Sequence, residues 1–286
     1  MTTFIHQKQK PLTASGLGRF FDCAVDPQDI RETVQEHGVA IVKGLEFTEA
    51  EFRKFVEGLG KKISYEEDSA NVGYGFEDIL HLNGSYETEK VITGRGGLPL
   101  HTDGVLLGTQ VDFIILFAAE VENLTNNGAT LVCDQISAWN EMPFELRDVL
   151  SRGKLEYRAT ERGYFTNVPD DWYEISTFRD YGRVKSLNIA LPFSSDEPDS
   201  WDVRVPGMSS EMSTRFFSNL QDYLMQKRYV YEHCWSTGDL IVIDNQKTLH
   251  GRRSLNSKGV RVLFRGQVTL PKIAQASDVL SVLKQV

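Results

Sequence analysis

Residues 98–119, LPLHTDGVLLGTQVDFIILFAA, decide the fold class, because a histidine–x–aspartate motif leads directly into a long apolar run. The run from Val111 to Ala119 is typical of a strand that is buried on both faces. Shorter strands are predicted after it, separated by turn residues, at 129–133, 229–235, 240–243 and 261–269. Several short strands with turns between them favour a sandwich or barrel. We therefore predict a mainly β fold with flanking helices (α+β).

The segment of about 27–61 is predicted to fold as helix, strand and helix. Asp26 and Pro27 suit a helix start, and Thr48 with Glu51 forms a capping box that begins the second helix. Residues of about 63–97 are rich in glycine and aromatic residues, which is typical of a lid-like or binding loop. A β-rich core of about 98–270 follows. No linker divides the chain, so we expect one domain over residues 1–286.

Composition excludes several classes of protein. The 286 residues are 41% hydrophobic and 25% charged, which is ordinary for a globular protein. The net charge of −9 disfavours nucleic acid as a partner. The polar N-terminus has no signal-peptide pattern, no apolar run is long enough for a membrane span, and the three cysteines lie far apart. We expect a cytoplasmic protein without a membrane partner, and the sequence does not indicate its oligomeric state.

His101 and Asp103 are the first candidate metal ligands. They stand two residues apart, so in a strand their side chains share a face. A third ligand that is also histidine would complete a two-His-one-carboxylate triad, which leaves positions open for other ligands. His250 is the natural third ligand, because it follows the strand predicted at 240–243 and precedes a polar loop. The His-x-Asp motif alone is weak evidence, since a chain with six histidines contains one by chance in roughly one case in three or four.

Two arginines follow His250 on the last predicted strand. Arg261 and Arg265 are four residues apart, so in an extended strand they share a face, and their neighbours are apolar. A guanidinium is a planar donor suited to a carboxylate. A cosubstrate with two carboxylates would need one end on the metal and the other on such an arginine.

The ordered set resembles the clavaminate synthase-like and taurine dioxygenase-like family of 2-oxoglutarate oxygenases, and within it the carbapenem synthases. The resemblance covers nearly the whole chain and is densest in three blocks, at 93–120, 128–143 and 235–267. It implies a double-stranded β-helix (jelly-roll) core, as in cupins. It also implies iron(II) held by His101, Asp103 and His250, with 2-oxoglutarate and dioxygen as cosubstrates.

The resemblance assigns further roles at matching positions. Arg261 would pair with the distal carboxylate of 2-oxoglutarate, together with the hydroxyl of Thr130, and Arg252 would also face this cosubstrate. Arg265 matches an arginine that holds a substrate carboxylate. Two aromatic residues, Tyr65 and Trp201, match positions of the substrate pocket.

The chain departs from the carbapenem synthases at two pocket positions. Phe165 replaces a tyrosine implicated as the hydrogen donor for ring inversion, and Ala190 replaces a second tyrosine. We therefore expect an enzyme that hydroxylates or desaturates a small carboxylate, such as an amino acid or a β-lactam-like metabolite of antibiotic biosynthesis or other secondary metabolism, and releases succinate and CO2.

Three alternatives remain open at this point. The first is epimerisation and desaturation of a carbapenam with another donor, such as Tyr164 or Tyr65. The second is a non-catalytic jelly-roll protein that binds a small molecule. The third is a cupin-type metalloenzyme that uses no 2-oxoglutarate, for which Arg261 and Thr130 would be unnecessary.

Overall fold

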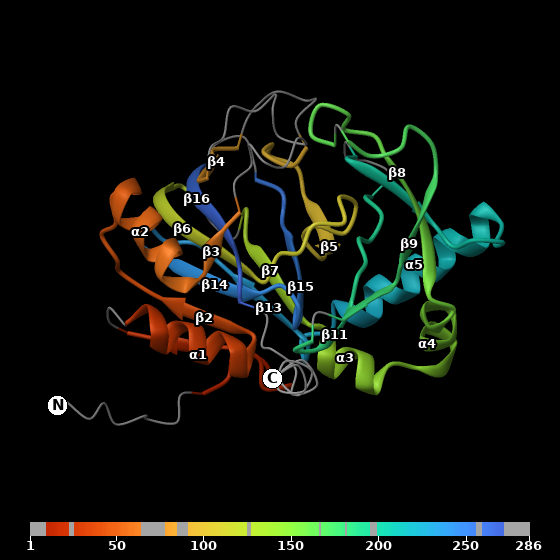
Figure 1. The fold of residues 1–286 in the computed structure, drawn as a ribbon, viewed down its shortest axis with the longest axis horizontal. Helices are drawn as coiled ribbons and strands as arrows, with labels where there is room; N and C mark the ends of the chain where they lie inside the picture. The colour runs from red at the N-terminus through yellow and green to blue at the C-terminus, as the bar shows by residue number, and fades with distance from the viewer. Residues whose placement is uncertain are drawn as a thin grey trace, which may run out of the picture.

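Two β-sheets that pack against each other form the centre of the molecule (Figure 1). A computed structural model describes residues 10–22, 26–63, 78–84, 91–124, 127–165, 167–180, 182–194, 199–255 and 259–271. The larger sheet has the order β1 (Arg19–Phe21), β2 (Val39–Val42), β14 (Leu240–Asp244), β6 (Phe113–Glu122), β16 (Val260–Thr269) and β3 (Lys61–Lys62), and β4 (Leu80–Leu82) also pairs with β16. The smaller sheet has the order β13 (Val230–His233), β7 (Thr130–Asp134), β15 (Thr248–Arg252) and β5 (Leu98–His101).

Strand alternation explains how the larger sheet is buried on both faces. In β2, Val39 and Ile41 face the interior between the sheets, whereas Ala40 and Val42 face the two N-terminal helices. The long strand β6 alternates in the same way, with Ile114 on the interior side. A strand with two buried faces must be apolar at every position, which is why its sequence is an unbroken apolar run.

Helices α1 (Pro27–His37) and α2 (Glu49–Leu59) cover the outer face of the larger sheet (Figure 1). Asp26 caps α1 by accepting a hydrogen bond from the backbone N–H of Gln28. The Thr48 and Glu51 capping box begins α2. Both helix starts agree with the sequence prediction. The mainly β fold with flanking helices is confirmed.

A further layer covers the outer side of the smaller sheet. It contains helices α3 (Gln135–Glu141), α4 (Phe144–Ser151) and α5 (Ser210–Leu224), a sheet of β12 (Trp201–Arg204), β8 (Lys154–Ala159) and β9 (Tyr173–Ser176), and the pair β10 (Phe178–Asp180) and β11 (Lys185–Leu187). One hydrophobic cluster joins these elements to the smaller sheet through Leu131, Cys133 and Leu249. From the sequence we also predict a helix over residues 143–150, which corresponds to α4, and no other element of this layer.

The region predicted as a long loop, 63–97, includes a strand among its described residues. Strand β4 lies within it, and Leu80, His81 and Leu82 pair with Arg265, Phe264 and Leu263 of β16. Residues 64–77 and 85–90 lie outside the described residues, so closure of a lid stays a prediction, as does the assignment of 1–286 to one domain. Among the described residues, no helix is long and apolar enough to span a membrane.

Candidate metal and cosubstrate site

His101 and His250 are neighbours across two strands of the smaller sheet. His101 ends β5 and pairs directly with His250 of β15, and their ring centroids lie 4.2 Å apart. The Nδ1 atom of His101 lies 2.9 Å from the carbonyl oxygen of Pro99. A ring nitrogen that donates to a carbonyl leaves the other nitrogen with its lone pair, so Nε2 of His101 is free to bind a metal.

Asp103 lies in a turn just beyond β5 and not on the strand. We expected Asp103 beside His101 because alternate residues of a strand share a face. The structure does bring the two side chains together, but through a turn and not through strand alternation. The side chain of Asn245 fixes this turn: its Oδ1 accepts from the N–H of Asp103 at 2.9 Å, and its Nδ2 donates to the carbonyls of Asp103 and Val111 at 3.2 and 2.9 Å. Asn245 lies between β14 and β15, five residues before His250, so it ties both ligand-bearing segments together.

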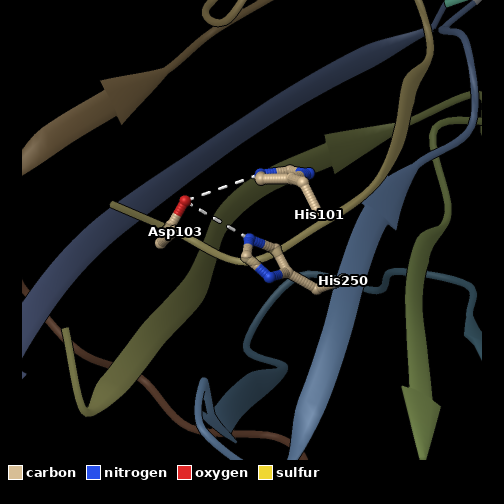
Figure 2. A group of neighbouring side chains, drawn as sticks. All are labelled: His101, Asp103 and His250. Atoms are coloured by element: carbon tan, nitrogen blue, oxygen red, sulfur yellow. Dashed lines mark ion pairs between the residues drawn. The ribbon is translucent and has the colours of Figure 1, made fainter. Parts of the chain in front are cut away.

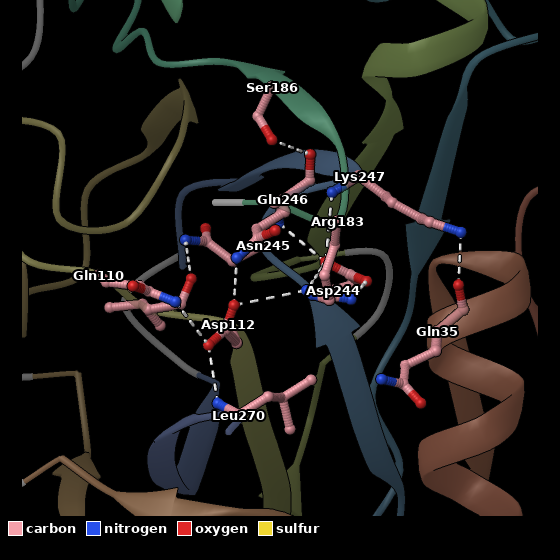
Figure 3. A network of polar contacts seen from close by, with 12 residues as sticks. Gln35, Gln110, Asp112, Arg183, Ser186, Asp244, Asn245, Gln246, Lys247 and Leu270 are labelled. Carbon is pink, nitrogen blue, oxygen red and sulfur yellow. Dashed lines mark hydrogen bonds and ion pairs between the residues drawn. The ribbon is translucent and has the colours of Figure 1, made fainter. Parts of the chain in front are cut away.

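A buried polar network supports Asn245 from behind (Figure 3). Its centre is a pair of carboxylates, Asp112 and Asp244, which are 1% and 0% exposed. Arg183 donates to both oxygens of Asp244 at 3.0 and 3.2 Å and approaches Asp112 at 3.5 Å. The backbone N–H of Asn245 donates to the carbonyl of Asp112. Sequence reasoning missed this network, because nothing in the spacing of these residues shows that they meet.

The three candidate ligands converge on one point (Figure 2). One ligand atom from each of His101, Asp103 and His250 lies within 4.8 Å of the others. The Oδ1 atom of Asp103 is 3.5 Å from Nε2 of each histidine. All three side chains are nearly buried, at 10–11% exposure.

The charges of these residues suit a metal. Burial, followed by the nearby His101, lowers the pKa of His250 to about 4, so its imidazole is neutral at physiological pH. Burial alone would raise the pKa of Asp103, but the charge of Arg265 and contacts with the histidines hold it well below its usual range. Two imidazoles and one carboxylate are the donor set of a facial triad.

Arg261 lines the same cavity, and its guanidinium is buried there. It is 1% exposed, and its Nη1 donates to the carbonyl of Gly128. Its Nε is buried without a hydrogen-bond partner among the described residues. Burial, followed by the charges of Arg252 and Arg95, lowers the pKa of Arg261 to about 9. A buried guanidinium without a counter-ion fits a ligand carboxylate.

Thr130 lines the cavity together with Arg261, as the resemblance implies. Its hydroxyl is 3.0 Å from Nε1 of Trp235, which donates to it. Since a hydroxyl both donates and accepts, that of Thr130 keeps its proton for a ligand oxygen.

Arg252 lines the cavity, and its role toward the cosubstrate stays a prediction. Its guanidinium also has a structural role, because it donates to the backbone carbonyls of Val91, Ile92 and Gly96 at 2.7–3.0 Å. The N–H groups of Val91 and Ile92 donate to the buried carboxylate of Glu161 at 2.9 and 3.3 Å. Arg252 and Glu161 therefore clamp the segment 91–96 against the site from two sides.

The substrate residues expected from the resemblance are placed in three different ways. Arg265, Trp201 and Phe165 line the cavity, and the Trp201 ring lies 5.7 Å from that of His101. Ala190 is buried behind His101, with which its backbone forms a bridge, and the described cavity lining does not include it, so its contact with a substrate stays a prediction. Tyr65 lies outside the described residues.

The cavity wall combines a polar floor with apolar sides. The floor carries the candidate ligands, Arg261, Arg265 and Gln267, and the sides include Tyr164, Phe165, Trp201, Leu98, Ile92 and Leu106. Such a cavity can accept a polar chelating molecule at the ligands and an apolar group beside the aromatic rings. The other described histidines serve elsewhere: His233 pairs with Asp239 and His81 with Glu49.

A jelly-roll core with two histidines and a carboxylate at one cavity defines a class, that of the non-haem metal oxygenases. The family model described as "Taurine catabolism dioxygenase TauD, TfdA family" matches residues 17–267, and the chain belongs to this family. The protein is an iron(II)- and 2-oxoglutarate-dependent dioxygenase.

Two named enzymes and a solved structure are similar to this chain. The 3-((Z)-2-isocyanoethenyl)-1H-indole synthase of Fischerella ambigua is 21% identical over 80% of this chain and 81% of its own length. The (S)-phenoxypropionate/alpha-ketoglutarate-dioxygenase of Delftia acidovorans is 34% identical, over 63% of this chain and 62% of its own length. The crystal structure of PvcB from Pseudomonas aeruginosa is 18% identical and superposes with a TM-score of 0.68, covering 92% of this chain and 88% of its own. That structure supports the fold.

Proposed function

We propose that His101, Asp103 and His250 hold the iron and that Arg261 with Thr130 holds the distal carboxylate of 2-oxoglutarate. The observation that carries this proposal is that one cavity holds both a group of metal-ligand atoms and a buried guanidinium. Three ligand atoms lie within 4.8 Å of one another, and Nε of the buried Arg261 guanidinium has no hydrogen-bond partner among the described residues. A dicarboxylate could chelate a metal at the ligand atoms with one end and pair with Arg261 through the carboxylate at its other end. The two alternatives, a non-catalytic jelly-roll protein and a cupin enzyme that uses no 2-oxoglutarate, do not explain why Arg261 is buried at the cavity.

The chain's own residues prepare the site for this chemistry. When bound, iron and 2-oxoglutarate supply a two-electron oxidation that consumes dioxygen and releases succinate and CO2. Asn245 positions the carboxylate ligand, and the Pro99 carbonyl orients His101. The clamp of Arg252 and Glu161 holds segment 91–96 over the cavity, which helps to exclude water from a reactive centre.

The substrate that suits the cavity is a small carboxylate with an apolar or aromatic body. Its ring would lie against Phe165 and Trp201, and its carboxylate would approach Arg265 from the cavity side. Two relatives have names that contain an aromatic group, an indole in one and a phenoxy group in the other. We propose hydroxylation or desaturation as the reaction, with an amino acid or a related metabolite as the substrate.

Epimerisation and desaturation of a carbapenam is the second candidate. It requires a hydrogen donor beside the substrate, and Phe165 has none. The neighbouring Tyr164 lines the cavity, and its ring contacts that of Phe165 at 4.9 Å. This phenol is the described residue that favours the candidate, although the relatives named above give it no support.

A succinate-release assay over a substrate panel tests the proposal. The panel holds phenoxypropionates, aromatic amino acids, cyclic imino acids and carbapenams, and products are identified by mass. A gain of one oxygen indicates hydroxylation and a loss of two hydrogens indicates desaturation. If the wild type inverts a stereocentre of the substrate and a Tyr164→Phe variant does not, the second candidate is favoured. Succinate release that no panel member stimulates would contradict the proposed substrate class.

A further inference from the structure

We infer that Gln267 and Arg265 are positioning residues that hold the Asp103 carboxylate with one oxygen toward the two imidazoles. This inference rests on the proposed metal ligands and goes beyond them. The resemblance implied that Arg265 holds a substrate carboxylate, and it assigned no role to Gln267. The structure places both side chains on Asp103.

The two oxygens of Asp103 have different partners. Oδ2 accepts a hydrogen bond from Nε2 of Gln267 at 2.7 Å and a charge-assisted one from Nη2 of Arg265. Oδ1 faces Nε2 of His101 and of His250, each 3.5 Å away. The carboxylate is therefore oriented by its far oxygen, and its near oxygen is left for the point on which the three ligands converge.

Strand β16 supplies both donors from a rigid position. Residues at alternate positions of a strand share a face, and Arg261, Leu263, Arg265 and Gln267 all line the cavity. Arg265 and Gln267 pair with Leu116 and Ile114 of β6, in the middle of the larger sheet. They are 7% and 6% exposed, so their side chains have little freedom to leave Asp103. One strand thus carries the proposed cosubstrate anchor at one end and the carboxylate holder at the other.

The arrangement has a chemical consequence for a facial triad. A metal held by these three residues would have coordination positions open for other ligands. If the Asp103 carboxylate bound the metal through both oxygens, it would occupy one of those positions. Two donors on Oδ2 disfavour that mode, because a metal would have to displace a buried ion pair and a buried hydrogen bond. Gln267 and Arg265 would therefore keep that position open.

A Gln267→Met variant tests this inference, because it removes the donor and keeps the length and charge of the side chain. Co(II) is the probe, measured by calorimetric titration and by its visible absorption spectrum. We expect Co(II) binding to weaken by about 10- to 100-fold, as for other groups that orient metal ligands, and the spectrum to change. Arg265→Lys, which keeps a charged donor, should stay closer to the wild type in both readouts than Arg265→Met.

Gln135→Met is the matched control. Gln135 is also buried, at 1% exposure, and its amide bonds the backbone of Gln246, Thr248 and Leu187, not Asp103. This variant should lose stability without a change in the Co(II) spectrum. Folded Gln267→Met protein with wild-type affinity and spectrum would overturn the inference, as would an equal loss in Gln135→Met. Wild-type protein that binds no Co(II) would instead overturn the proposed metal site itself.

Discussion

Replacing Arg261 by methionine should lower the affinity for 2-oxoglutarate without lowering the stability of the fold. Arg261 is 1% exposed, and the structure gives it one backbone acceptor, the carbonyl of Gly128. Burial lowers its pKa to about 9, which means that the folded protein tolerates this charge poorly. Methionine fills a similar volume without a charge and removes the buried Nε, which has no hydrogen-bond partner in the described part of the chain.

The expected magnitudes follow from the burial. Loss of one partner of a buried, hydrogen-bonded charge pair costs about 2–5 kcal/mol of binding free energy, and each 1.4 kcal/mol is about a tenfold change. The affinity for 2-oxoglutarate should therefore fall by about 30-fold to several thousandfold. The free energy of unfolding of the metal-free protein should stay the same or rise by about 1 kcal/mol, because an unpaired buried charge is removed.

Two assays on the same protein decide the matter. Calorimetric titration with 2-oxoglutarate in the presence of Mn(II) gives the affinity, and urea unfolding of the metal-free protein gives the stability. A variant that binds 2-oxoglutarate as tightly as the wild type would refute the assignment of Arg261. A variant destabilised by about 3 kcal/mol or more would show that Arg261 is a structural residue of the core.

Three further predictions concern the residues around the site. Asn245→Ala removes three hydrogen bonds of the Asp103 turn and should cost on the order of 3 kcal/mol in urea unfolding and at least about tenfold in Mn(II) affinity; an unchanged affinity would exclude a positioning role. As the pH falls from 6.5 to about 4, unfolded chains protonate at His250 and folded, metal-free chains do not, so the free energy of unfolding should fall by up to about 3 kcal/mol. His250→Gln should lack this part of the pH dependence, and a variant with the same slope as the wild type would contradict it. Arg252→Met should raise amide hydrogen exchange in segment 91–97 by about tenfold or more while Mn(II) affinity stays unchanged, and unaltered exchange would reject the clamp.

The sequence predicted the parts of the fold that local patterns encode. The capping box at Thr48 and Glu51 and the apolar run of β6 were readable because each depends on a few neighbouring residues. Helix α5 was missed, although Ser209 caps it. The strands β8 to β12 were missed as well. The alternation of polar and buried apolar residues in β8 could have revealed it, whereas β10 and β11, with three residues each, are too short to show a pattern.

The candidate site was predictable as a set of residues but not as an arrangement. The motif of His101 and Asp103 is local, Arg261 was found from its place on an apolar strand after His250, and the resemblance supplied Thr130. The partners of Asp103 are not local: Asn245, Arg265 and Gln267 reach it across 142 to 164 residues of sequence. Contacts of this kind depend on the register of β16 against β6, which the sequence does not reveal.

The central claim is that this chain binds iron(II) and 2-oxoglutarate together at one site. Anaerobic titration of the folded protein with iron(II) in excess 2-oxoglutarate, followed by visible absorption, tests it most directly. We expect a weak charge-transfer band that saturates at equimolar iron and is lost in Asp103→Ala. Folded protein that gives no band at any iron concentration would contradict joint binding of iron(II) and 2-oxoglutarate.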